Sequence, residues 1–276
     1  MRRSKLVPLM LALVLVAASG CLGAGTDDPT NSDSAITSGM DDSAVREAVV
    51  SSSEEVERYA MTMNQTYSGG GFNSSTTYQG VIDRESRRAR LNITSEGNGE
   101  TQRMATIVDE PAIYSKQETG TNWTKRNSES FEWRTIDRLS VLVELLEQSN
   151  ATAVGSTTVD GSGATVLEAD VEQETLAEVA SGGNESTAGQ AEPNVTMSLR
   201  AVVDNATARP QTITLHTVRS SEFGSSESTL TVTIDTYGVE TQIGTPQETV
   251  TATVRTGSDG ATTTVVTASA PPTEEG

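Results

Sequence analysis

The chain has 276 residues, and its 38 acidic against 19 basic side chains give a formal net charge of −19 at pH 7. Proteins that bind nucleic acids carry a basic surface that contacts the phosphate backbone. Because this chain is strongly acidic, we expect no nucleic-acid partner. Because it holds a single cysteine, an intramolecular disulfide is excluded, and stability must come from a hydrophobic core.

The first 21 residues have the features of an export signal. A cationic start precedes an apolar run over residues 6–18, and small residues then lead to Cys21. As a helix this run covers about 20 Å, which is too short for a bilayer core of about 30 Å. The ending Ala18-Ser19-Gly20-Cys21 resembles the lipobox of bacterial and archaeal lipoproteins, although Ala18 stands where that pattern has Leu. We therefore expect residues 1–20 to be a signal peptide and Cys21 to be lipidated.

The alternative is a plain signal peptide with an incidental cysteine. The Arg2-Arg3 pair leaves both Sec and twin-arginine export open.

Residues 21–40 comprise this cysteine and a segment rich in Gly, Ser, Thr and Asp, which predicts a flexible tether. Lysine is rare, and arginine supplies nearly all the positive charge. High acidity with little lysine resembles the proteins of salt-loving archaea. In molar salt the Debye length falls to about 3 Å, so dense surface charge causes little self-repulsion. An ordinary acidic secreted protein is the alternative.

The next segment predicts one helix and then a run of strands. Acidic residues at the start of 41–56 indicate a capped helix. After it, Tyr59, Met61 and Met63 alternate with small and polar residues, which is typical of a strand with one buried face. Gly69–Gly71 and Asn98-Gly99 mark turns, and these short connections predict an antiparallel meander. The further strands are expected at Thr76–Asp83, Arg88–Thr94, Gln102–Val108 and Ala112–Gln117.

The middle of the chain predicts a polar loop over 123–133 and then a helix over Thr135–Ser149. Its apolar face is wider than one sheet contact needs, whereas Asp137, Arg138, Glu144 and Glu147 are expected to face away from it. A hairpin that turns at Asp160-Gly161, a short helix over 174–180 and a polar loop over 181–193 follow.

The last part predicts a second meander that is apolar on one face only, ending at the phrase Tyr237–Pro246. Residues 247–276 are expected to add further strands, with a hairpin at Asp259-Gly260, and a polar tail.

This element order resembles the LolA-like and LppX/LprG-like lipoproteins. The resemblance rests on the order itself, on Val56–Tyr59 entering the first strand, on Tyr114 before Trp123, and on the closing Tyr237–Pro246. It implies an α+β fold in which a strongly curved antiparallel sheet, a half-barrel, wraps over a few helices in one domain over residues 41–246. The strands after Pro246 depart from the pattern.

Members of this group carry lipids, lipoproteins or glycolipids in an apolar cavity between sheet and helices. By that resemblance, the cavity would be lined by Tyr59, Met61, Met63, Leu91, Ile93, Leu139, Leu142 and Leu146. The alternative is that these side chains simply form the core.

No catalytic motif is present. A lone histidine, His216, without a cysteine partner does not make a structural zinc site, so we expect no metal, no cofactor and no enzymatic activity. Several Asn-x-Ser/Thr triplets are candidate glycosylation sites, and Asn73, Asn122 and Asn184 are favoured because they are expected in loops.

These observations predict an exported, non-catalytic lipoprotein that Cys21 anchors to the outer face of the cytoplasmic membrane. We expect a monomer that binds a hydrophobic ligand, either a lipid or a lipidated partner. A structural or interaction lipoprotein of a glycosylated envelope, with a filled core, is the first alternative, and an extracytoplasmic enzyme without a recognisable motif is the second.

Overall fold

The computed structural model describes residues 36–37, 39–127, 133–181, 194–221, 224–240, 243–246 and 250–251. The predicted signal peptide, Cys21, nearly all of the tether, Asn184 and the hairpin at Asp259-Gly260 lie outside these described residues.

The first helix, α1 (Asp42–Glu54), begins after Asp41. The Asp41 carboxylate accepts a hydrogen bond from the Ala44 N–H at 2.9 Å, as a helix N-cap does. Hydrogen bonds from the Ser43 hydroxyl and from this N–H lower the pKa of the Asp41 carboxyl. The predicted capped start is therefore confirmed, and the helix ends shortly before the expected Val56.

A first meander follows α1 and a second one closes the described chain. The first comprises β1 (Arg58–Gly69), β2 (Phe72–Asp83), β3 (Arg88–Gly97), β4 (Glu100–Asp109), β5 (Ala112–Gln117) and β6 (Thr124–Asn127). Next come the 3₁₀ turn η1 (Trp133–Thr135), α2 (Arg138–Gln148), β7 (Thr152–Val159), β8 (Ser162–Asp170) and α3 (Gln173–Ser181). The second meander consists of β9 (Val195–Asp204), β10 (Pro210–Ser221) and β11 (Gly224–Tyr237), and the two-residue β12 (Val250–Thr251) lies beyond it.

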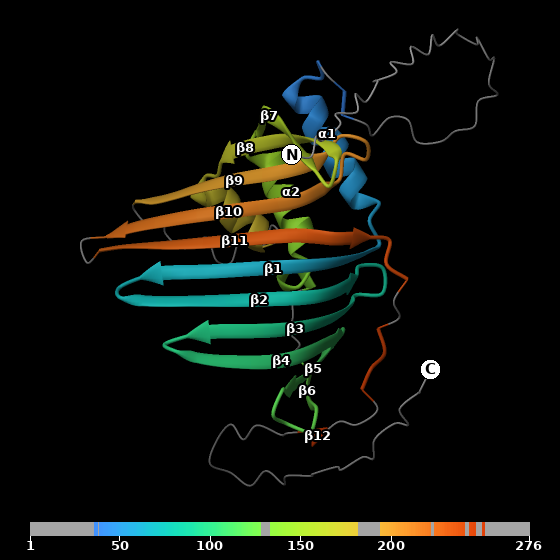
Figure 1. Ribbon diagram of the computed structural model, residues 1–276, viewed down its shortest axis with the longest axis vertical. Coiled ribbons are helices and arrows are strands. Elements are labelled where there is room, and N and C mark those ends of the chain that lie inside the picture. Colours follow the sequence, from blue (N-terminus) through green and yellow to red (C-terminus); the bar gives the residue numbers. More distant parts are fainter. Residues whose placement is uncertain are drawn as a thin grey trace, which may run out of the picture. The chain divides into compact units, whose positions relative to one another are not determined.

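The strands form one sheet in the order β12-β6-β5-β4-β3-β2-β1-β11-β10-β9-β8-β7 (Figure 1). β1 and β11 pair in its middle, with Met63 opposite Val232, so the first and last long strands join the two meanders. From β6 to β7 every neighbouring pair is antiparallel, and only β12 runs parallel to β6 among the described strands. The order has two ends, so the sheet is not closed. The predicted α+β class with one antiparallel sheet is confirmed, and the open sheet is consistent with the predicted curved half-barrel.

Tight turns set the register of the hairpins. Asn98 and Gly99 between β3 and β4 have φ of 52° and 79°, and Asp160 and Gly161 between β7 and β8 have φ of 50° and 85°. Positive φ at both central residues is the requirement of a type I′ hairpin turn, which Asn-Gly and Asp-Gly pairs meet best. Both predicted turns are confirmed.

The helices pack on one face of the sheet, where they form the main core (Figure 1). α2 lies between α1 and α3 as well as over the sheet, which explains its wide apolar face. Its buried side chains are Leu139, Val141, Leu142, Val143, Leu145 and Leu146.

A smaller apolar cluster lies on the opposite face of the sheet. Ile107 belongs to it, whereas its neighbour Val108 belongs to the main core, because successive side chains of a strand point to opposite faces. Ile243 packs beside Ile107 and Tyr114, and the Thr245 hydroxyl donates to Asp109 at 2.9 Å. Residues 243–245 thus pack on the outer face of β4 and β5.

Two predicted loop assignments are wrong. The loop expected over 123–133 contains β6, where Lys125 lies opposite Tyr114 with its ammonium 5.5 Å from the ring centre. This short polar strand has no apolar alternation to reveal it. Asn73 lies in β2 rather than in a loop, because the turn comprises only Gly70 and Gly71.

None of the helices within the described ranges is long and apolar enough to cross a membrane.

Gly80 of β2 is a point of close approach between strands. A Cβ at this position would lie 1.9 Å from the carbonyl oxygen of Arg90 on β3. We expect Gly80→Ala to lower the free energy of unfolding by about 1–3 kcal/mol, because the two backbones would have to separate. Urea unfolding measures this difference. Gly155→Ala in β7 is the matched control, since nothing lies within 4 Å of a Cβ there. Equal stability of the two variants would contradict the close approach.

Candidate functional site

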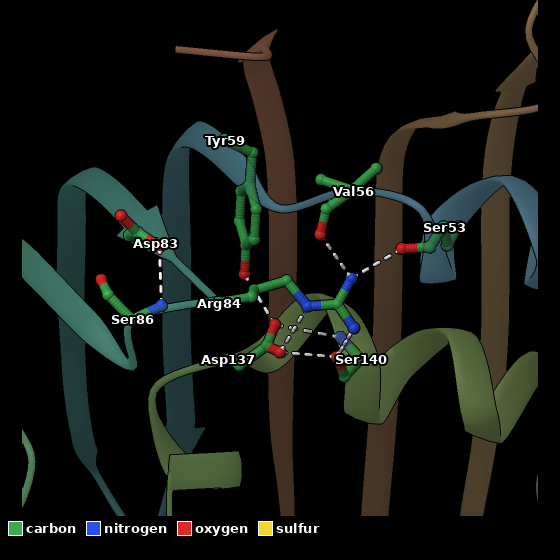
Figure 2. Close-up of polar contacts among 8 residues, drawn as sticks. All are labelled: Ser53, Val56, Tyr59, Asp83, Arg84, Ser86, Asp137 and Ser140. Carbon is green, nitrogen blue, oxygen red and sulfur yellow. Dashed lines mark hydrogen bonds and ion pairs between the residues drawn. The ribbon is translucent and has the colours of Figure 1, made fainter. Parts of the chain in front are cut away.

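A buried ion pair closes one end of the main core. Arg84, the first residue after β2, donates from Nε to Oδ2 of Asp137 at 3.0 Å. Asp137 is the N-cap of α2, so the pair connects the β2–β3 turn to the start of that helix (Figure 2). The two side chains are only 21% and 5% exposed, which means that both charges are largely removed from water.

Both oxygens of the Asp137 carboxylate accept hydrogen bonds. Oδ1 accepts hydrogen bonds from the Tyr59 hydroxyl at 2.9 Å and from the Ser140 N–H at 3.3 Å. Oδ2 accepts from Arg84 and from the Ser140 hydroxyl, the latter at 2.6 Å. Burial raises the pKa of the Tyr59 phenol well above its usual value, and the Asp137 charge adds to this rise. Tyr59 therefore remains a hydrogen-bond donor.

The guanidinium of Arg84 also binds the end of α1. Its Nη1 donates to the carbonyl oxygens of Ser53 at 2.6 Å and Val56 at 2.9 Å, and its Nη2 donates to the Ser140 hydroxyl at 2.6 Å (Figure 2). These carbonyls belong to the last turn of α1 and the link into β1, where a helix end leaves carbonyl groups without intrahelical donors; that of Ser53 also accepts from the Val56 N–H at 3.3 Å. One planar, permanently charged group thus holds α1, α2 and the first strands in a fixed relation.

Sequence periodicity had placed Asp137 on a face directed away from the core, and this is wrong. The residue is 3% exposed because it caps α2 instead of lying within it, and the helix begins at Arg138 rather than at Thr135. An aspartate three residues before Ser140, directly before an apolar run, is the N-cap signal that was available. No local pattern marks Arg84, since its partners are distant in sequence.

A pocket lies beside this network, between the sheet and the residues that lead into α2. Its volume is about 210 Å³. Four strands and the start of α2 contribute its lining. The lining residues are Met61, Met63, Gln65, Tyr78, Leu91, Thr135, Ile136, Arg138 and Leu230. We call it the methionine pocket.

The pocket is apolar inside and polar at its mouth. Met61, Met63 and Leu91 are buried and form its floor, whereas Gln65 and Thr135 are exposed. Methionine side chains are flexible and polarisable, so they adapt to bound groups of varied shape. Such a lining can hold a hydrocarbon group while its polar end remains near water.

Three of the predicted cavity residues, Met61, Met63 and Leu91, line the methionine pocket. All three also belong to the main core cluster. Of the other predicted residues, Tyr59, Leu139, Leu142 and Leu146 are buried in the same cluster without lining the pocket, and Ile93 packs at its border. The alternation in the sequence identified which face of the sheet is buried, but it did not distinguish residues packed in the core from residues that line a pocket. The use of the three pocket residues in ligand binding remains a prediction.

Two larger hollows in the described part have a different character. One of about 640 Å³ lies at the tips of the β1–β2 and β3–β4 hairpins, and one of about 610 Å³ lies along β8 and β9. Ser, Thr, Asn and Glu dominate both linings, so neither offers an enclosed apolar surface.

The remaining predicted positions lie apart from the pocket. His216 pairs with Glu227 at 2.9 Å on an exposed part of the sheet. Within the described ranges, no group of three or more His, Cys, Asp or Glu side chains could hold a metal ion. Asn73 and Asn122 are exposed, and their glycosylation stays a prediction that the intact mass of the natively produced protein tests.

No protein-family model matches the sequence, and no curated protein sequence matches it either. Among solved structures, lipoprotein LppX of Mycobacterium tuberculosis is similar at a TM-score of 0.48 and 11% identity, covering 74% of this chain and 98% of its own. LprF of Mycobacterium bovis has a TM-score of 0.47 and 6% identity over 74% and 96% of the two chains. LppX belongs to the group that the sequence resembles, but these scores are too low to assign the chain to a family.

We expect the Arg84 network to be a main source of stability. Arg84→Met should lower the free energy of unfolding by about 3–5 kcal/mol, because it leaves the buried Asp137 carboxylate without its counter-ion. Arg103→Met is the matched control: Arg103 pairs with Glu118, but these side chains are 56% and 63% exposed. Loss of that exposed pair should change stability by less than about 1 kcal/mol. Denaturant titration compares the two, and similar losses would show that the buried network has no special role.

Proposed function

We propose that this chain is an exported lipoprotein, anchored through a lipid on Cys21, that binds a hydrophobic ligand in the methionine pocket without catalysing a reaction. The observation that carries the binding proposal is the pocket itself. Its buried methionines and leucine lie on the helix-covered face of the sheet, and a short polar mouth gives access to them.

The composition of the pocket supports binding rather than catalysis. Apart from Arg138 and Tyr78, its lining contains no ionisable side chain, so it offers no carboxylate, histidine or cysteine for proton transfer or nucleophilic attack. A ligand would be retained by removal of its apolar surface from water, at about 25 cal/mol per Å².

A second function is favoured by the packing of the core. Most side chains of α2 on the core face are buried in the main cluster, and a pocket of about 210 Å³ is smaller than the roughly 300–1,000 Å³ of typical ligand sites. These facts support a structural or interaction lipoprotein of the envelope, in which the hollow is a packing irregularity next to the polar network.

Binding distinguishes these two functions. The protein, purified without detergent, should retain or take up a hydrophobic ligand that native mass spectrometry detects at near one-to-one stoichiometry. Leu230→Trp should abolish this uptake, because a larger side chain at the half-buried Leu230 fills the pocket. Leu176→Trp is the control, since Leu176 is half-buried against the core without lining the pocket. A folded, ligand-free protein that takes up no lipid would favour the structural role.

The anchor has a separate test. Cys21→Ser removes the thiol that would carry the lipid, so the protein should move from the membrane fraction into the medium when it is expressed in an archaeal or bacterial host. Its fold should be unaffected, which circular dichroism of the released protein checks. Unchanged retention in the membrane fraction would mean that Cys21 is not the anchor.

A further inference from the structure

Arg138 differs from the other arginines of the described part. Most of the other half-buried arginines meet a carboxylate. These pairs are Arg58 with Asp83, Arg84 with Asp137, Arg88 with Asp109 and Arg134 with Glu144, and the exposed Arg200 meets Glu168. Arg46 donates to the carbonyl of Ala151, and Arg209 lies over the ring of Tyr237.

The side chain of Arg138, by contrast, makes no hydrogen bond, ion pair or ring contact with any residue that the structure describes, although its backbone N–H donates to the Ile136 carbonyl at 2.9 Å. It is half-buried and lines the methionine pocket beside Tyr78. The acidic chain offers carboxylates in excess, so a half-buried arginine without one is not explained by a shortage of partners.

The position of Arg138 is also unfavourable for a cation. It is the first residue of α2, at the helix end where the aligned peptide dipoles place a partial positive charge. Burial in the pocket wall lowers the pKa of its guanidinium, because the charged form loses water that no nearby carboxylate replaces. An anion at the pocket mouth would relieve both costs.

We propose that Arg138 binds the anionic head group of a single-chain amphiphile whose hydrocarbon tail occupies the methionine pocket. This inference rests on the proposed ligand-binding function and names its ligand class. A carboxylate accepts two parallel hydrogen bonds from a guanidinium, and such a charge-assisted pair is strongest where water is largely excluded.

The size of the pocket selects one chain. A volume of about 210 Å³ is below the roughly 300–1,000 Å³ range of drug-sized ligands and leaves no room for a lipid with several acyl chains. Met61, Met63 and Leu91 would contact the tail, and Gln65 and Thr135 lie at the exposed mouth beside the head group.

The test uses decanoate, 1-decanol and decylammonium, which share one chain and differ in the charge of the head group. Calorimetric titration of the whole protein, in one buffer, should show decanoate binding at least about tenfold more tightly than decanol, with decylammonium weakest. Arg138→Gln should bring decanoate and decanol within about threefold of each other while leaving decanol affinity unchanged. Arg90→Gln is the matched control: it removes the same charge from an exposed arginine on the opposite face of the sheet, so the preference should persist.

The outcomes separate this inference from the proposed function. If all three probes bind equally, or if Arg138→Gln keeps the preference for decanoate, the ligand-binding function stands and the head-group role of Arg138 is wrong. If none of them binds the folded protein, both proposals are wrong. Loss of all binding in Arg138→Gln, including that of decanol, would contradict the proposal, because it would show that Arg138 maintains the shape of the pocket rather than binding the head group.

Discussion

The arrangement of helices over the sheet depends on the ion pair between Arg84 and Asp137. Removing two charges from water is costly, and such a pair stabilises a protein only when its remaining donors and acceptors are also satisfied. Here they are: the carboxylate accepts four hydrogen bonds, and the guanidinium reaches two carbonyls and a hydroxyl besides its counter-ion. Because these partners come from α1, β1, the β2–β3 turn and α2, only one arrangement of those elements satisfies them all. We therefore expect the network to favour this one geometry as well as to stabilise it.

This constraint also explains why a hollow persists in an otherwise filled core. Protein interiors close small cavities when neighbouring elements are free to shift. Ile136 and Arg138 directly flank Asp137, so the network fixes the backbone that forms one wall of the methionine pocket. The opposite wall consists of paired strands, whose register is regular apart from a shift between β1 and β11 at Ala60 and Met61. With both walls held, the flexible methionines are left to adjust, and they can do so around a ligand.

The sequence predicted those parts of the fold that local patterns encode. Alternation in β1 identified the buried face of Met61 and Met63, and the Asn-Gly and Asp-Gly pairs located two hairpin turns. What it did not predict depends on contacts between distant segments. Arg84 has no local signature because its partners lie on other elements, and β6 is too short and polar to show a period. The difference between a packed leucine such as Leu142 and a pocket-lining one such as Leu91 is likewise set by tertiary geometry, since both sit at ordinary apolar positions.

The acidic charge of the chain opposes binding of an anionic ligand in the methionine pocket. With a net charge of −19, the protein as a whole repels anions, so long-range attraction would not bring an anionic amphiphile to it. Recognition of the anionic head group would have to come from a short-range contact, and the half-buried Arg138 in the pocket wall would provide one. Screening by salt acts strongly on exposed charges and much less on partly buried ones. Concentrated salt would therefore suppress the overall repulsion while largely preserving the contact with Arg138, and it would also strengthen burial of the tail. An acidic surface and a half-buried cation that has no partner among the described residues are thus compatible, and their combination would favour binding of an anionic amphiphile in concentrated salt.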